Sequence, residues 1–127
     1  MVPTFLGAHA VPPEHIGNKS QYVQEIIERM IPYISSHKLA IFCDVFCEQG
    51  FFTLDQSEKI LDQGKRFGML PKIHAEELSP LGGAQLAAKV GSISADHLEH
   101  ITGEGIGALA QAGVVASLLP GDRKSVV

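Results

Sequence analysis

Three histidines stand in or directly after short apolar segments of the sequence. His9 follows "TFLGA", His74 lies in "PKIHAEE", and His97 closes "SISADH". Neutral imidazole binds metal ions and accepts protons near pH 7, so this set of residues suits a metal-assisted or acid–base reaction. A single histidine in such a position is more often structural, and the prediction therefore depends on the three occurring together.

Glu77 follows His74 by three residues, at the start of a loop that contains Pro80 and two glycines. If His74 binds a metal ion, a carboxylate at this distance can accept a proton or orient a water molecule. The other interpretation is an exposed loop carboxylate, or a partner for the N-terminus of the next helix. The local sequence leaves both interpretations open.

The elements that must position these side chains are short apolar segments alternating with helical patterns. The segments are rich in Val, Ile, Leu, Phe, Ala and Cys, as buried parallel strands are, and span residues 4–10, 40–48, 71–77, 92–99 and 113–121. Helical patterns lie between them, at residues 20–38, 53–68, 82–91 and 102–113. This alternation predicts an α/β fold with an all-parallel sheet. Because the carboxyl ends of parallel strands meet at one edge, we expect the three histidines to gather there.

Local sequence signals mark where some of the helices begin and end. Thr53 and Gln56 have the spacing of a capping box, which predicts a helix that begins at residue 54. Gly68 suits the position after the end of that helix. Pro32 predicts a break or kink near the end of the first helix.

Cys43 and Cys47 are four residues apart within one predicted strand. This spacing does not match a CxxC motif, and both side chains would point to the same face, too far apart to form a disulfide. We interpret them as two reduced thiols in the core.

Size and composition fit one ordinary globular domain. The chain has 127 residues, of which 45% are hydrophobic and 19% charged, with a net charge of −4. Scattered basic residues and a negative net charge argue against nucleic acid as a partner. No apolar run reaches the roughly 18 residues of a membrane span, and no secretory signal is evident at the N-terminus. We therefore expect a cytoplasmic protein.

Four stretches of the sequence resemble one enzyme family. "TFLGAHAVPPE", "FCDVFCEQGFF", "PKIHAEELSPLGGAQLAA" and "GSISADHLEHI" are similar to the imidazolonepropionase family of the metal-dependent amidohydrolases. The resemblance runs from about residue 3 to Gly121. It implies a partial barrel domain at 1–121, with about strands three to seven of an eight-stranded TIM-type (β/α) barrel, and a non-family tail at 122–127.

The resemblance also implies a reaction and roles for individual residues. The reaction is the hydrolysis of 4-imidazolone-5-propanoate to N-formimino-L-glutamate in histidine degradation, with one zinc or iron ion per complete site. His74 would be a metal ligand, and Glu77 would contact both the substrate and the attacking water. His9 would bind substrate, and His97 would act beside the metal as a catalytic hydrogen-bonding group. The family further implies a homodimer.

Parts of the family pattern are missing from this chain. The family's His-x-His metal-binding pair has no counterpart in the sequence, and neither has the aspartate of its eighth strand. The resemblance thus provides one metal ligand, His74, and predicts a central piece of the enzyme that is inactive alone. Two alternatives stay open: another cyclic-amide hydrolase or deaminase of the amidohydrolases, and a non-catalytic half-barrel that associates with itself.

Overall fold

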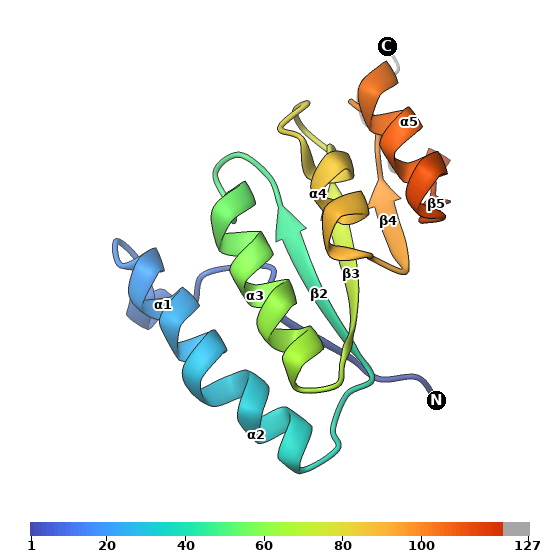
Figure 1. Ribbon diagram of the computed structural model, residues 1–127. Helices are drawn as coiled ribbons and strands as arrows, with labels where there is room; N and C mark the ends of the chain where they lie inside the picture. Colours follow the sequence, from blue (N-terminus) through green and yellow to red (C-terminus); the bar gives the residue numbers. More distant parts are fainter. Residues whose placement is uncertain (121–127) are drawn as a thin grey trace.

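Strands and helices alternate along the chain in a computed structural model that describes residues 1–120 (Figure 1). The strands are β1 (Thr4–Ala8), β2 (Phe42–Cys47), β3 (Leu70–Ala75), β4 (Ser94–His97) and β5 (Val115–Ser117). The helical elements are η1 (Pro13–His15), α1 (Lys19–Glu25), η2 (Ile26–Met30), α2 (Ile31–Ser36), α3 (Leu54–Arg66), α4 (Gly83–Val90) and α5 (Gly103–Ala112). Among these described elements, no helix combines the length and the apolar character that a membrane crossing requires. The tail predicted at 122–127 lies outside the described residues.

The five strands form one parallel sheet in the order β1-β2-β3-β4-β5. This confirms the predicted α/β class and the all-parallel sheet. Each strand pairs with the next one in the sequence, as successive βα units in a barrel do. The register places His74 of β3 beside Phe46 of β2 and Asp96 of β4. Residues from three strands therefore meet in one row.

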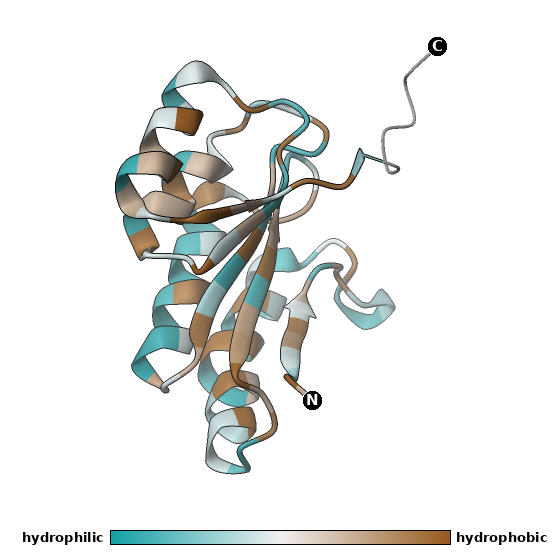
Figure 2. Ribbon diagram, turned by 90° about the vertical axis from the view of Figure 1, so that its right-hand side faces the viewer, coloured by the Kyte–Doolittle hydropathy of each residue, from teal (hydrophilic) through white to brown (hydrophobic). Residues whose placement is uncertain are grey.

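The two faces of the sheet differ in what covers them. The helices lie on one side of the sheet in both views (Figures 1 and 2). On β2 the helix-facing residues Cys43, Val45 and Cys47 are fully buried, and alternation turns Asp44 to the opposite face. Helix α3 approaches β2 so closely that a Cβ on Gly64 would lie 2.9 Å from the Cβ of Cys43. The predicted pair of reduced core thiols is confirmed, since both cysteines are free and buried.

The predicted boundaries of α3 are confirmed. The Thr53 hydroxyl accepts a hydrogen bond from the Gln56 N–H at 3.1 Å, and the Gln56 side chain accepts one from the Thr53 N–H at 3.1 Å. These two bonds satisfy backbone donors that the first turn of a helix leaves free. Gly68 follows the end of the helix with a φ of +86°, a conformation that favours glycine.

The break predicted at Pro32 takes a different form in the structure. Helical backbone continues from η2 through Pro32, the second residue of α2. The irregularity comes earlier, at the π-helical turn η2, where the Ile31 N–H bonds to the carbonyl of Ile26. A widened turn directly before a proline relieves the steric clash that the ring would otherwise cause.

Candidate active site

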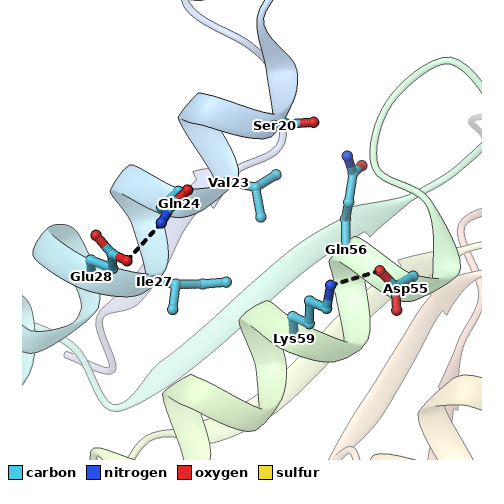
Figure 3. A pocket seen from close by; sticks show the side chains of 8 residues that line it. All are labelled: Ser20, Val23, Gln24, Ile27, Glu28, Asp55, Gln56 and Lys59. Carbon is cyan, nitrogen blue, oxygen red and sulfur yellow. Dashed lines mark hydrogen bonds and ion pairs between the residues drawn. The ribbon is translucent and has the colours of Figure 1, made fainter.

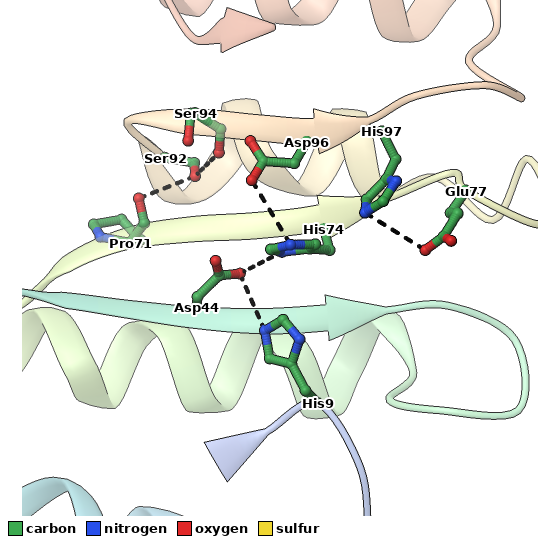
Figure 4. A network of polar contacts seen from close by, with 9 residues as sticks. All are labelled: His9, Asp44, Pro71, His74, Glu77, Ser92, Ser94, Asp96 and His97. Atoms are coloured by element: carbon green, nitrogen blue, oxygen red, sulfur yellow. Dashed lines mark hydrogen bonds and ion pairs between the residues drawn. The ribbon is translucent and has the colours of Figure 1, made fainter. Parts of the chain in front are cut away.

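The three predicted histidines lie side by side at the carboxyl edge of the sheet (Figure 4). His9 directly follows β1, His74 lies near the end of β3, and His97 is the last residue of β4. The ring centroid of His74 is 4.7 Å from that of His9 and 5.1 Å from that of His97. The expectation that strand ends bring these residues together is confirmed.

Asp44 lies between two of these histidines and was not among the predicted site residues. Its Oδ1 accepts a hydrogen bond from His74 Nδ1 at 2.9 Å and is 3.5 Å from His9 Nε2. The side chain is only 2% exposed. Burial alone would raise the pKa of Asp44, but the hydrogen bonds and charges of His74 and His9 outweigh it and lower the pKa. Asp44 is therefore a buried anion that fixes the ring of His74.

The other nitrogen of His74 faces a second carboxylate. His74 Nε2 is 3.7 Å from Oδ2 of Asp96, its neighbour across the β3–β4 pair. Burial opposes a charged imidazole, but the hydrogen bond and charge of Asp44, together with the charge of Asp96, raise the pKa of His74. With Nδ1–H bound to Asp44, Nε2 is the ring nitrogen left to accept a ligand.

Glu77, in the loop after β3, and His97, at the end of β4, face each other. Glu77 Oε2 is 3.6 Å from His97 Nε2, with Glu77 27% and His97 10% exposed. The backbone at this point is unusual: Glu76, His97 and Leu98 all have φ between +55° and +79°. Non-glycine residues in this conformation are costly, and they cluster at functional sites. The structure thus places the Glu77 and His97 side chains beside each other.

The donor atoms around His74 suit a transition-metal ion. One atom each from His9, Asp44 and His74 lie within 4.8 Å of one another. Asp44 Oδ1 lies 2.9 Å from His74 Nδ1 and 3.5 Å from His9 Nε2, which makes it the hydrogen-bonding partner of these imidazoles and leaves His74 Nε2 as the metal-binding atom. An imidazole nitrogen is a donor that zinc and iron both accept, and a carboxylate on the other nitrogen is a usual outer partner of such a ligand. The residues present therefore fit a metal ion.

Two hollows in the described surface differ in their chemistry. One of about 300 Å³ adjoins His97 and is otherwise lined mainly by apolar residues, among them Leu98 and Leu118. The other, of about 320 Å³, lies between α1, η2 and α3, far along the chain from the histidines (Figure 3). Its polar groups already pair with one another, for example Lys59 with Asp55 at 3.0 Å. Of these two hollows, the first has one of the three predicted histidines, His97, at its wall.

Sequence comparison adds a relationship to this geometry. An imidazolonepropionase of Shouchella clausii is 55% identical to this chain over 121 residues, which are 95% of the chain and 27% of the relative. One of Geobacillus kaustophilus is 55% identical over 95% of the chain and 28% of the relative. One of Bacteroides fragilis is 52% identical over 94% of the chain and 29% of the relative. The chain is homologous to part of an imidazolonepropionase. It spans less than a third of the length of these curated relatives.

Two further comparisons bear on the fold. A solved Xaa-Pro dipeptidase with bound methionine has a TM-score of 0.50 and 19% identity, over 61% of this chain and 21% of that one. At this identity the likeness concerns the arrangement of strands and helices alone. No family model matches the chain. The imidazolonepropionase relationship thus rests on the sequence identity with the relatives named above.

Three buried carboxylates at this edge escaped prediction. Asp44, Glu48 and Glu76 are at most 2% exposed. A charged residue inside an apolar segment, as in "FCDVFC", is itself a signal, because carboxylates are almost never fully buried without partners. The partners of Glu48 and Glu76 lie in the loop after β3, and the conformation of that loop does not follow from the sequence.

Proposed function

We propose that the protein carrying this segment is an imidazolonepropionase, which hydrolyses 4-imidazolone-5-propanoate to N-formimino-L-glutamate. The observation that supports this most strongly is the meeting of Glu77 and His97 beside His74 in a chain 55% identical to that enzyme. In the reaction, water adds across the ring amide. Its oxygen bonds to the carbonyl carbon, the ring C–N bond breaks, and the nitrogen leaves with a proton.

Glu77 and His97 divide the proton handling in this proposal. The Glu77 carboxylate, 27% exposed beside His97, accepts a proton from the attacking water or holds the ring N–H. His97 Nε2, 3.6 Å away, donates a hydrogen bond to the oxygen that becomes negative as the water adds. His9, 25% exposed at the end of β1, contacts the substrate from the opposite side of His74.

His74 is the metal ligand of the proposal, and Asp44 holds it in place. The hydrogen bond from Nδ1 to Asp44 fixes the imidazole tautomer and leaves Nε2 to bind the metal, an arrangement typical of metal-bound histidine. A zinc or iron ion bound there supplies a water of lowered pKa and polarises the carbonyl. The cytoplasmic location and the homodimer implied by the resemblance belong to the same proposal.

The test uses two samples. The first is the 127-residue chain, for which the proposal predicts no turnover, because His74 has too few protein ligands beside it for a catalytic metal. The second is a chimeric enzyme, the Shouchella clausii imidazolonepropionase with its 121 matched residues replaced by those of this chain. Hydrolysis of the imidazolone, followed by ultraviolet absorbance, is expected in the chimeric enzyme. A chimera that folds and binds metal but leaves this substrate intact would refute the proposed function.

A further inference from the structure

The loop that carries Glu77, residues 76–82 between β3 and α4, is held by two buried carboxylates from outside the histidine cluster. Glu48 comes from the end of β2 and is 1% exposed, and Glu76 is fully buried. Among the described residues, their side chains accept hydrogen bonds from this loop and from Gln49. Buried carboxylates are costly to desolvate, so their presence here needs a compensating role.

Glu48 binds the loop at the two residues that follow Glu77. Its Oε2 accepts a hydrogen bond from the Leu78 N–H at 2.9 Å, and its Oε1 accepts one from the Ser79 hydroxyl. The Gln49 N–H donates a second hydrogen bond to Oε1, at 2.9 Å. Burial acts to raise the pKa of Glu48, but these donors outweigh it and lower the pKa. The carboxylate is therefore held in its charged form.

Glu76 binds the same loop at its other end. Its Oε1 accepts a hydrogen bond from the Gly82 N–H at 3.0 Å, across a turn of six residues. Its backbone, with φ at +55°, turns the chain sharply between His74 and Glu77. Its carbonyl accepts a hydrogen bond from the His100 N–H at 2.8 Å, which links the loop to the one that follows His97.

We propose that Glu48 and Glu76 are positioning residues, which together hold residues 76–82 so that the Glu77 carboxylate faces His97. The proposal rests on the proposed function, since it assigns Glu77 its place in that reaction. It predicts that releasing the loop costs turnover without removing the metal, because neither carboxylate lies among the donors around His74.

The test replaces the Glu48 carboxylate by its neutral isostere, Glu48→Gln. The amide keeps one oxygen and replaces the other by an NH₂ group that accepts no hydrogen bond, so either the bond from Leu78 or the bonds from Ser79 and Gln49 are lost. In the chimeric enzyme we expect kcat to fall about 10- to 100-fold, with metal content unchanged. The control is Glu104→Gln, an exposed glutamate in the first turn of α5, for which kcat should stay within a factor of two or so.

Amide hydrogen exchange supplies a readout that does not depend on activity. In the 127-residue chain, Glu48→Gln should speed exchange of the Leu78 N–H or the Gln49 N–H by about tenfold or more, according to which one loses its acceptor, while amides of β2 and β3 keep their protection. A merely structural glutamate would speed exchange across the sheet as well. Unchanged exchange at both Leu78 and Gln49 would overturn the proposal. Unchanged kcat in a chimeric enzyme that is active without the substitution would overturn it as well. If the unsubstituted chimera is inactive but Glu48→Gln speeds exchange in the loop, the proposed function is refuted. The inference that Glu48 holds residues 76–82 then still stands.

Discussion

Replacing Asp44 by asparagine tests the role of the buried anion at the centre of the site. Asparagine keeps an oxygen that can accept the His74 Nδ1–H, but it introduces an NH₂ group at a position that is 2% exposed. A buried donor without an acceptor costs about 1–3 kcal/mol. We therefore expect the free energy of unfolding of the metal-free chain to fall by about that amount.

The same substitution should weaken metal binding. Losing the charged partner of a metal-bound histidine typically lowers affinity 10- to 100-fold, which is about 1.4–2.8 kcal/mol of binding free energy. Urea denaturation of the 127-residue chain and zinc competition titration of the chimeric enzyme measure the two effects. The control is Asp55→Asn, whose side chain is 74% exposed and pairs only with Lys59 on the surface; it should change stability by about 0.5 kcal/mol or less. Equal zinc affinity in Asp44→Asn and the unsubstituted protein would show that Asp44 does not hold His74 for a metal.

Two further predictions concern packing and the thiols. In Gly83→Ala the new Cβ would lie 2.6 Å from the Cβ of Ala75, so we expect a loss of about 1–3 kcal/mol in urea denaturation; unchanged stability would mean that α4 does not pack so closely on β3. Burial raises the pKa of Cys43 to about 12 and of Cys47 to about 11. A thiol reagent at pH 8 should therefore modify neither thiol until the chain unfolds, since the thiolate is the reactive form; rapid labelling of folded protein would contradict the buried assignment.

The sequence allowed the strands, most helix boundaries and the gathering of three histidines to be predicted. Each of these depends on local chemistry: apolar runs, a capping box at Thr53, and the rule that parallel strands end at one edge. The position of Asp44 required the register of β1, β2 and β3, because its two contacts come from the neighbouring strands. Register is set by packing across the whole sheet, which a single sequence does not reveal.

Loop conformation limited the prediction in a second way. Glu48 and Glu76 read as ordinary acidic residues after strands, and their burial follows only once the loop after β3 folds back over β2. Pro32 likewise reads as a break, whereas the π-helical turn before it lets the helix continue. The loop after β3 donates hydrogen bonds to the two buried carboxylates, and the π-helical turn accommodates the proline. Rules that consider only the residue and its sequence neighbours do not predict either effect.

Metal content and turnover of Glu77→Gln, measured on one preparation of the chimeric enzyme beside His74→Ala, test the central claim most directly. The account predicts that Glu77→Gln keeps its metal by elemental analysis and loses most of its imidazolone hydrolysis, because Glu77 handles a proton and does not hold the metal. His74→Ala should lose both metal and turnover. Metal loss in Glu77→Gln comparable to that in His74→Ala would contradict the roles assigned to these two residues.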